Sequence, residues 1–125
     1  IQARDAEWRQ TSGIDAGMQA LLDNAAAQEL RRLEKSEAFF FEIFLMDGQG
    51  ANVAMTNKTS DYWQGDEAKF TESFAGGQGS VHVGDVEFDE SAQAYLVQVS
   101  VPVLQDGQAI GAMTIGIDLD ALEGQ

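Results

Sequence analysis

The first third of the chain has the apolar spacing of an amphipathic helix. Its apolar side chains recur at intervals of three and four residues, which aligns them on one helical stripe: Ile14, Met18, Leu21, Leu22, Ala25, Leu30 and Leu33. Ser12 and Asp15 have the spacing of a capping box that would begin this helix. The residues around Trp8 could equally extend it towards the N-terminus. We expect a long helix within residues 1–36, with its stripe serving as core packing or as a dimer seam.

From Phe39 onward the pattern becomes that of β-strands. Residues 39–46 are rich in aromatic and branched side chains and too few for a long helix, so we expect a strand in their second half. Residues 47–50 have turn chemistry and residues 51–55 alternate, which predicts a β-hairpin. Residues 66–74 have the composition of a short helix, and the glycines of residues 76–79 form a connector.

The last third predicts three further strands. Residues 81–88 alternate, residues 95–103 alternate with valine at every second position from Val97, and residues 110–117 return after a turn at Asp106 and Gly107. The order of elements predicts an α+β domain in which a long N-terminal helix packs on a five-stranded antiparallel sheet. A length of 125 residues fits one domain, with its sheet core at residues 39–118.

The strongly acidic composition excludes a nucleic-acid partner. Aspartate and glutamate number 21 against 7 lysines and arginines, a formal charge of −14 that repels a phosphate backbone. The acidic run Asp85, Glu87, Asp89 and Glu90 lacks the central glycine of a calcium loop, so we expect a solvated strand edge there. We predict no metal and no other cofactor.

Enzymatic activity is not expected of this domain. An enzyme site needs a nucleophile, a base and an orienting group. The chain has one histidine, His82, and no cysteine, so the remaining candidates are carboxylate pairs, which any acidic protein offers. The absence of cysteine also excludes disulfides and thiolate metal sites. A catalytic output domain such as a histidine kinase would lie outside these residues.

One loop, residues 57–70, concentrates the candidate chemistry. It combines two adjacent rings, Tyr62 and Trp63, with two ammonium groups, Lys58 and Lys69, and several hydroxyls and carboxylates. Loops held on a rigid sheet are common places for small-molecule recognition. The alternative is that the rings cover a face of the sheet and the lysines are solvated.

Four segments carry a resemblance to a known family: residues 42–47, residues 59–69, residues 86–91, and residues 110–118 with Ile110-Gly111-Ala112 and Gly116-Ile117-Asp118. With them the chain resembles, over essentially its full length, the single Cache or PDC family of PAS-like extracytoplasmic sensor domains. The segment Thr59-Ser60-Asp61-Tyr62-Trp63-Gln64-Gly65-Asp66-Glu67-Ala68-Lys69 is the most specific of these motifs.

The resemblance implies roles for individual residues. Tyr62 and Trp63 match the aromatic pair that walls the ligand pocket, and amino-acid-binding relatives carry an arginine just before that pair. Ser60 and Asp61 stand there in this chain, so the usual guanidinium clamp on a carboxylate is missing. Lys69 or Lys58 could take its place as a point charge.

Three further residues are weaker candidates for ligand contacts. Tyr95 and Asp118 lie where relatives place a ring hydroxyl and an amine-binding carboxylate, although Asp118 could simply cap the exit from the sheet. His82 alternates with Val81 and Val83 and therefore points to the opposite face, where it would contact a ligand if that face holds the pocket.

The implied function is ligand sensing. The resemblance implies a periplasmic, extracytoplasmic sensor domain of a bacterial transmembrane protein, namely a histidine kinase, a chemoreceptor or a diguanylate cyclase, that binds a small polar metabolite such as a short carboxylate. No apolar run approaches the roughly 20 residues that span a bilayer, so we expect membrane anchors outside these residues. The alternatives are a free-standing periplasmic binding protein and a homodimerisation module without ligand, built on the stripe around Met18 and Leu22.

Overall fold

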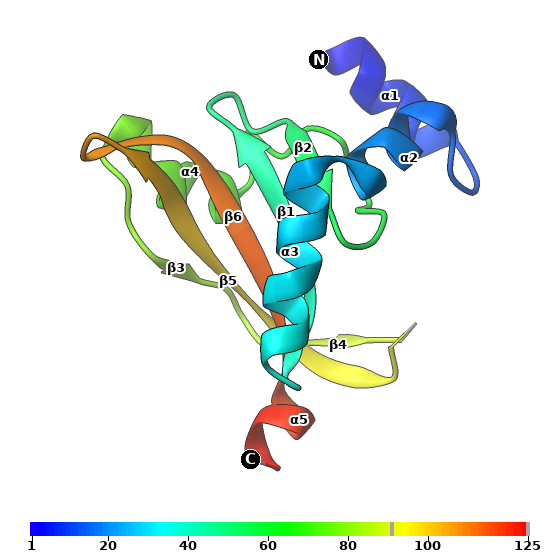
Figure 1. Ribbon diagram of the computed structural model, residues 1–125, viewed down its shortest axis with the longest axis vertical. Helices are drawn as coiled ribbons and strands as arrows, with labels where there is room; N and C mark the ends of the chain where they lie inside the picture. The colour runs from blue at the N-terminus through cyan, green and yellow to red at the C-terminus, as the bar shows by residue number, and fades with distance from the viewer. Residues whose placement is uncertain (91, 125) are drawn as a thin grey trace.

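Helices and one antiparallel sheet make up the protein (Figure 1). A computed structural model describes residues 1–90 and 92–124. The helices are α1 (Gln2–Gln10), α2 (Ala16–Asp23), α3 (Ala25–Ser36), α4 (Ala68–Phe74), the short 3-10 helix η1 (Ala75–Gly77) and α5 (Leu119–Glu123). The strands are β1 (Phe40–Asp47), β2 (Asn52–Met55), β3 (His82–Val83), β4 (Glu87–Asp89), β5 (Ala94–Gln105) and β6 (Gln108–Asp118).

The first and the last strand of the chain, β1 and β6, are neighbours in the sheet. Its order is β2-β1-β6-β5-β3, with β4 pairing the other end of β5. β5 and β6 form the long hairpin that the alternating valines predict, and Asp106 and Gly107 make its turn with φ angles of 52° and 81°. Positive φ at both positions matches the twist of the flanking strands. The predicted hairpin of β1 and β2 is also confirmed, with β1 beginning at Phe40.

Helices cover both faces of this sheet. On one face α3 packs Ala27 and Leu30 against Ile43 and Ala54. On the other face a larger cluster brings together residues of α1, α2, α4 and three strands: Trp8, Met18, Leu22, Phe44, Met46, Met55, Phe70 and Ala112. Figure 1 shows α3 in front of the sheet and α4 behind it. The expected α+β class, with helix packed on antiparallel sheet, is therefore confirmed.

The N-terminal region is three helices, and the expectation of one long helix is wrong. Asp15, predicted as the downstream partner of Ser12, is itself the N-cap of α2 and accepts the amide of Met18 at 2.8 Å. Asn24 has extended backbone angles between α2 and α3, and its side-chain oxygen caps α3 at the amide of Ala27. Short polar side chains at both positions satisfy helix ends and so stop the helix from continuing.

Part of the predicted stripe serves the core, whereas Ile14 and Ala25 are exposed. Met18 is fully buried and Leu22 is 8% exposed, so this pair lies inside the chain and offers no surface to a second copy. Within the described residues, none of the helices combines the length and the apolar character needed to cross a bilayer.

The run 81–88 forms two short strands, which makes the sheet six-stranded rather than five-stranded. β3 pairs with β5 at His82 and Ser100, and β4 pairs with it at Phe88 and Tyr95. The amide of Gly84 still donates to the carbonyl of Gln98 at 2.8 Å, so the run follows β5 as one interrupted edge. Residues 84–86 leave the regular ladder between the two strands.

Asn24→Ala tests the helix break. Besides capping α3, the Asn24 amide group donates to the carbonyl of Val53 at 2.8 Å and thereby attaches the break to β2. Loss of the cap and of this bond should lower the free energy of unfolding by about 2 kcal/mol. Chemical denaturation measures this, with Lys35→Ala on the exposed face of α3 as a control expected to change it by less than about 0.5 kcal/mol. An equal effect of both substitutions would contradict the assignment.

Candidate functional site

Two adjoining cavities lie on the α4 face of the sheet. The larger has a volume of about 620 Å³ and is enclosed by β1, β5, the start of α4 and the segment 82–90. The smaller, of about 420 Å³, lies between β1 and loop residues 57–60. The two cavities meet at four residues that line both: Glu42, Lys69, Asp89 and Gln98.

A cross-strand row of Glu42, Gly116 and Gln98 forms the floor where the cavities meet. Glu42 of β1 and Gln98 of β5 both pair with Gly116 of β6, which lies between them. A Cβ on Gly116 would come within 2.9 Å of the Glu42 side chain, so the glycine leaves room for the carboxylate to lie across the sheet. In the next row the buried hydroxyls of Ser100 and Thr114 bond each other at 2.8 Å, so they do not compete for a ligand.

Lys69 is the cation at the junction of the cavities. Its ammonium lies 3.9 Å from Glu67 Oε1 and 5.5 Å from the centroid of the Phe44 ring. The chain enters α4 at Glu67, which is its N-cap residue, so the start of this helix carries both charges to the cavity wall. Lys69, which the sequence analysis proposed as a ligand contact, therefore lines both cavities.

Two glutamates of the site are held in a partly dehydrated environment. Burial raises the pKa of Glu42, the negative charges of Asp89 and Glu34 raise it further, and Lys69 opposes them. Burial also raises the pKa of Glu67, against the attraction of Lys69. Glu67 Oε2 is buried and has no hydrogen-bond partner among the described residues. Both carboxylates would gain from a nearby positive charge.

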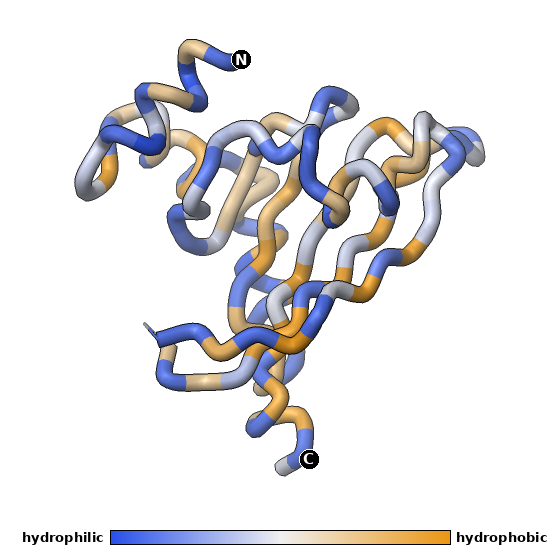
Figure 2. Tube along the Cα trace, turned by 180° about the vertical axis from the view of Figure 1, so that it is seen from behind, coloured by the Kyte–Doolittle hydropathy of each residue, from blue (hydrophilic) through white to orange (hydrophobic). Residues whose placement is uncertain are grey.

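The acidic run forms one wall of the larger cavity. Asp85, Glu87, Asp89 and Glu90 line it, together with the apolar side chains of Phe88 and Leu96. Seen from behind in Figure 2, the strand that leads to the grey trace at residue 91 is mostly hydrophilic, with apolar positions interspersed. The expectation of a merely solvated strand edge is therefore incomplete, because the run has one side towards a cavity.

Two of the other predicted residues also reach the cavities. His82 lines the larger one, as its alternation with Val81 and Val83 suggested. Lys58 lines the smaller one, and its ammonium donates to the carbonyls of Thr11 and Gly13 at 2.8 Å each. Lys58 therefore connects the cavity wall to the loop between α1 and α2.

The two predicted aromatic residues lie elsewhere. The Tyr62 ring packs against the Trp8 ring with centroids 5.5 Å apart, and Trp63 Nε1 donates to the carbonyl of Gln49 at 2.7 Å. Neither ring lines either cavity. The structure brings the polar residues of this loop to the site and directs the ring pair towards α1 and the first hairpin.

Tyr95 and Asp118 also lie outside both cavities. Tyr95 is exposed and packs edge-on against Phe88, with ring centroids 5.0 Å apart. The Asp118 carboxylate accepts the amide of Ala121 at 3.2 Å and caps α5. Asp118 therefore has the capping role that the sequence left open as the alternative.

A buried carboxylate on α1 holds the loop in place. Asp5, 3% exposed, accepts the amides of Tyr62 and Trp63 at 3.0 Å each and pairs with Arg9. Burial alone would raise the pKa of Asp5, but the bonds from Trp63, Arg9 and Tyr62 outweigh it and leave this pKa below its ordinary value. The stabilisation is therefore present above the ordinary pKa and is lost as pH falls through the lower one.

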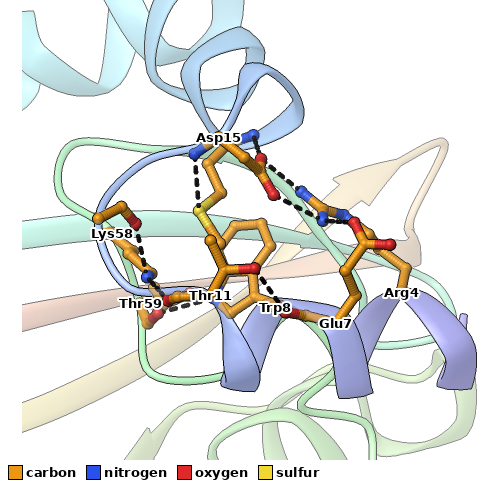
Figure 3. A network of polar contacts seen from close by, with 9 residues as sticks. Arg4, Glu7, Trp8, Thr11, Asp15, Lys58 and Thr59 are labelled. Carbon is orange, nitrogen blue, oxygen red and sulfur yellow. Dashed lines mark hydrogen bonds and ion pairs between the residues drawn. The ribbon is translucent and has the colours of Figure 1, made fainter.

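A second set of contacts fixes α1 to α2 and to the loop (Figure 3). The Trp8 indole donates to the carbonyl of Thr59 at 2.8 Å, and Arg4 makes a two-bond contact with Asp15 at 2.9 and 3.0 Å. Hydrogen bonds from Arg4 and from the amide of Met18 lower the pKa of Asp15 to about 2. The helices and the loop residues of the smaller cavity thus form one connected unit.

The sequence analysis missed Glu42 and Glu67 as site residues. A signal for Glu42 was present, because it shares strand parity with Phe44 and Met46 and is thus a charge on an apolar face. Glu67 carried no such signal, since its position depends on how the loop packs beneath α4.

Asp5→Ala tests the attachment of the loop to α1. Two amides lose their acceptor, so the free energy of unfolding should fall by about 3 kcal/mol. Amide exchange at Tyr62 and Trp63 should also become faster, as hydrogen-exchange NMR would record. Glu7→Ala is the control, because Glu7 pairs with Arg4 at the surface, where an ion pair is worth less than about 1 kcal/mol. Unchanged exchange at both amides would contradict this role.

Glu42→Gln should stabilise the protein at neutral pH. The raised pKa means that ionised Glu42, facing Asp89, Glu34 and Lys69, destabilises the fold above its pKa, and this penalty vanishes below the ordinary pKa. The melting temperature should rise by about 2 °C at pH 7 and should not rise at about pH 3.5. Glu72→Gln, exposed on α4, is the matched control. A rise that persists at the lower pH would show another cause.

Comparisons with known proteins identify neighbours of this fold. No protein-family model matches the chain, and no curated protein matches its sequence. The sensor domain of the Vibrio cholerae histidine kinase DctB matches with a TM-score of 0.55 and 20% identity, over 85% of this chain and 44% of that one. The ligand-binding domain of the Pseudomonas aeruginosa amino acid chemoreceptor PctC, in complex with GABA, matches at 0.56 and 16%, over 99% and 52%.

A third neighbour gives the same picture. The sensory domain of the Campylobacter jejuni chemoreceptor Tlp3 matches with a TM-score of 0.61 and 15% identity, over 98% of this chain and 52% of that one. The chain thus spans about half the length of these neighbours. At such identities the likeness concerns the fold, and the chain shares the fold of bacterial sensor domains from a histidine kinase and from chemoreceptors.

Proposed function

We propose that this chain is the extracytoplasmic ligand-sensing domain of a bacterial transmembrane signalling protein, and that it binds a small polar metabolite in the two adjoining cavities. The observation that carries the proposal is the larger cavity, enclosed by the sheet, the start of α4 and segment 82–90. Its volume of about 620 Å³ is in the usual range for small-molecule sites. We also propose that this domain belongs to the Cache family.

The structural neighbours support a sensing role. The sensor domains of DctB, PctC and Tlp3 share the fold, and the PctC domain was solved with GABA and the Tlp3 domain with isoleucine. A pocketed fold that other bacteria use for ligand detection favours the same use here. The proposal assigns no catalytic role to these residues, and it leaves the output domain to another part of the signalling protein.

Lys58 suggests how occupancy would reach the N-terminal helices. It lines the smaller cavity and donates to two carbonyls in the loop between α1 and α2. A bound ligand whose charge attracts or repels this ammonium changes those bonds and biases α1 towards a different position. A homodimer through the N-terminal helices remains part of the prediction, on surfaces other than the buried Met18 and Leu22.

A thermal-shift screen of small polar metabolites tests the proposal. A ligand at 100 times its dissociation constant adds about 2.7 kcal/mol to the folded state, which raises the melting temperature by several degrees. Gln98→Trp places a large ring at the junction of the cavities and should abolish the shift. Gln105→Trp makes the same change at the exposed end of β5 and should preserve it.

The two variants also define failure. No shift from any metabolite in a panel of acids, amines, amino acids and sugars would contradict the proposal. A shift that persists in Gln98→Trp would place the ligand elsewhere on the molecule.

A further inference from the structure

We infer that the larger cavity selects a small organic cation, an amine carried on an aliphatic chain, rather than a carboxylate. This inference rests on the proposed sensing function and specifies the chemical class of its ligand. Among the described residues, six carboxylates line this cavity: Glu42, Glu67, Asp85, Glu87, Asp89 and Glu90.

The positive charge in the same lining is much smaller. It consists of the Lys69 ammonium, with the His82 imidazole as the other basic group. Lys69 is already directed at Glu67, so it is a poor clamp for an incoming carboxylate. A ligand carboxylate would also meet the excess negative charge without the guanidinium that could offset it. Charge complementarity therefore favours a cationic ligand.

Two carboxylates of the lining, Glu42 and Glu67, have room for a further positive group, although Lys69 lies 3.9 Å from Glu67 Oε1. Glu67 Oε2 is buried without a hydrogen-bond partner among the described residues, and an ammonium N–H would provide one. Glu42 lies on the cavity floor, where burial and Asp89 raise its pKa despite Lys69. A bound ammonium would lower the free-energy cost of keeping both groups ionised.

The same cavity has an apolar surface for the rest of the ligand. Leu96, Phe88 and Val83 line it beside the carboxylates. An alkyl chain can lie against these side chains while its amino groups reach carboxylates from β1, from the start of α4 and from segment 82–90. Carboxylates that come from separate elements suit an elongated diamine with a charge at each end.

A metal ion fits this lining less well. No group of three or more ligating side chains converges on a point that could hold a metal within the part of the chain that the structure describes. Calcium needs six to eight oxygens at short range, whereas these carboxylates come from separate elements around a cavity of about 620 Å³. Because the carboxylates are dispersed around the cavity, they suit a ligand with several N–H donors better than a single metal ion.

Calorimetric titration with putrescine, succinate and butanediol tests the inference, because the three share a four-carbon chain and differ in charge. Putrescine should bind at least about tenfold more tightly than either of the others in about 150 mM salt. Glu42→Gln should weaken putrescine binding about tenfold, as expected for the loss of one charged hydrogen-bond acceptor. Glu72→Gln removes the same charge outside the cavity and should leave the affinity unchanged.

The outcomes separate this inference from the proposed function. Tighter binding of succinate or butanediol, abolished by Gln98→Trp, would overturn the cation preference and leave the sensing role standing. If calcium or magnesium displaces putrescine, and Glu42→Gln abolishes this displacement, the cavity binds a metal ion and the amine inference is overturned. If Glu42→Gln and Glu72→Gln weaken putrescine binding equally, the diamine is attracted by the acidic surface in general. That result would overturn the inference. Failure of the whole metabolite panel would remove both proposals.

Discussion

The buried carboxylate of Asp5 is the contact on which the position of the loop of residues 57–70 depends. It joins α1 to two successive amides, those of Tyr62 and Trp63, across more than fifty residues of sequence. An isolated charge would be costly at 3% exposure, but two amides and Arg9 satisfy it. The chain leaves this point along Gln64, which is itself buried and bonded to Asn52, and reaches Glu67 and Lys69 at the cavity. The contacts of Asp5 at Tyr62 and Trp63 therefore also help to position the part of the cavity wall that Glu67 and Lys69 form.

The cavity floor shows a balance between stability and recognition. Gly116 gives Glu42 room to lie across the sheet, in the row that it shares with Gln98. The cost is a carboxylate whose charge burial disfavours and whose neighbours include further negative groups. Strain of this kind is expected where a site is prepared for a partner that is not part of the fold. A cationic ligand supplies the missing charge and removes the cost when it binds.

The same connections give ligand binding a route to the N-terminus. Lys58 contacts the cavity on one side and the loop between α1 and α2 on the other, and the Trp8 indole holds Thr59 beside it. The Arg4–Asp15 contact joins α1 to the start of α2 (Figure 3). A change at the cavity can thus act on two helices through a small number of hydrogen bonds.

The sequence by itself determined the fold class, both hairpins and the short helix before the glycines, and it singled out Lys69, Lys58 and His82, which line the cavities. Those features follow from local patterns: alternation sets the face of a strand, and Asp106-Gly107 sets its turn. The break at Asn24 was harder to predict, because the helical spacing continues through it and the bond from Asn24 to Val53 joins residues that are distant in sequence. The directions of Tyr62 and Trp63 depended on Asp5 and Trp8, which are distant in sequence. Tertiary structure alone decided that the acidic run, Glu67 and Glu42 share one cavity, because a local pattern carries no information about which distant elements approach each other.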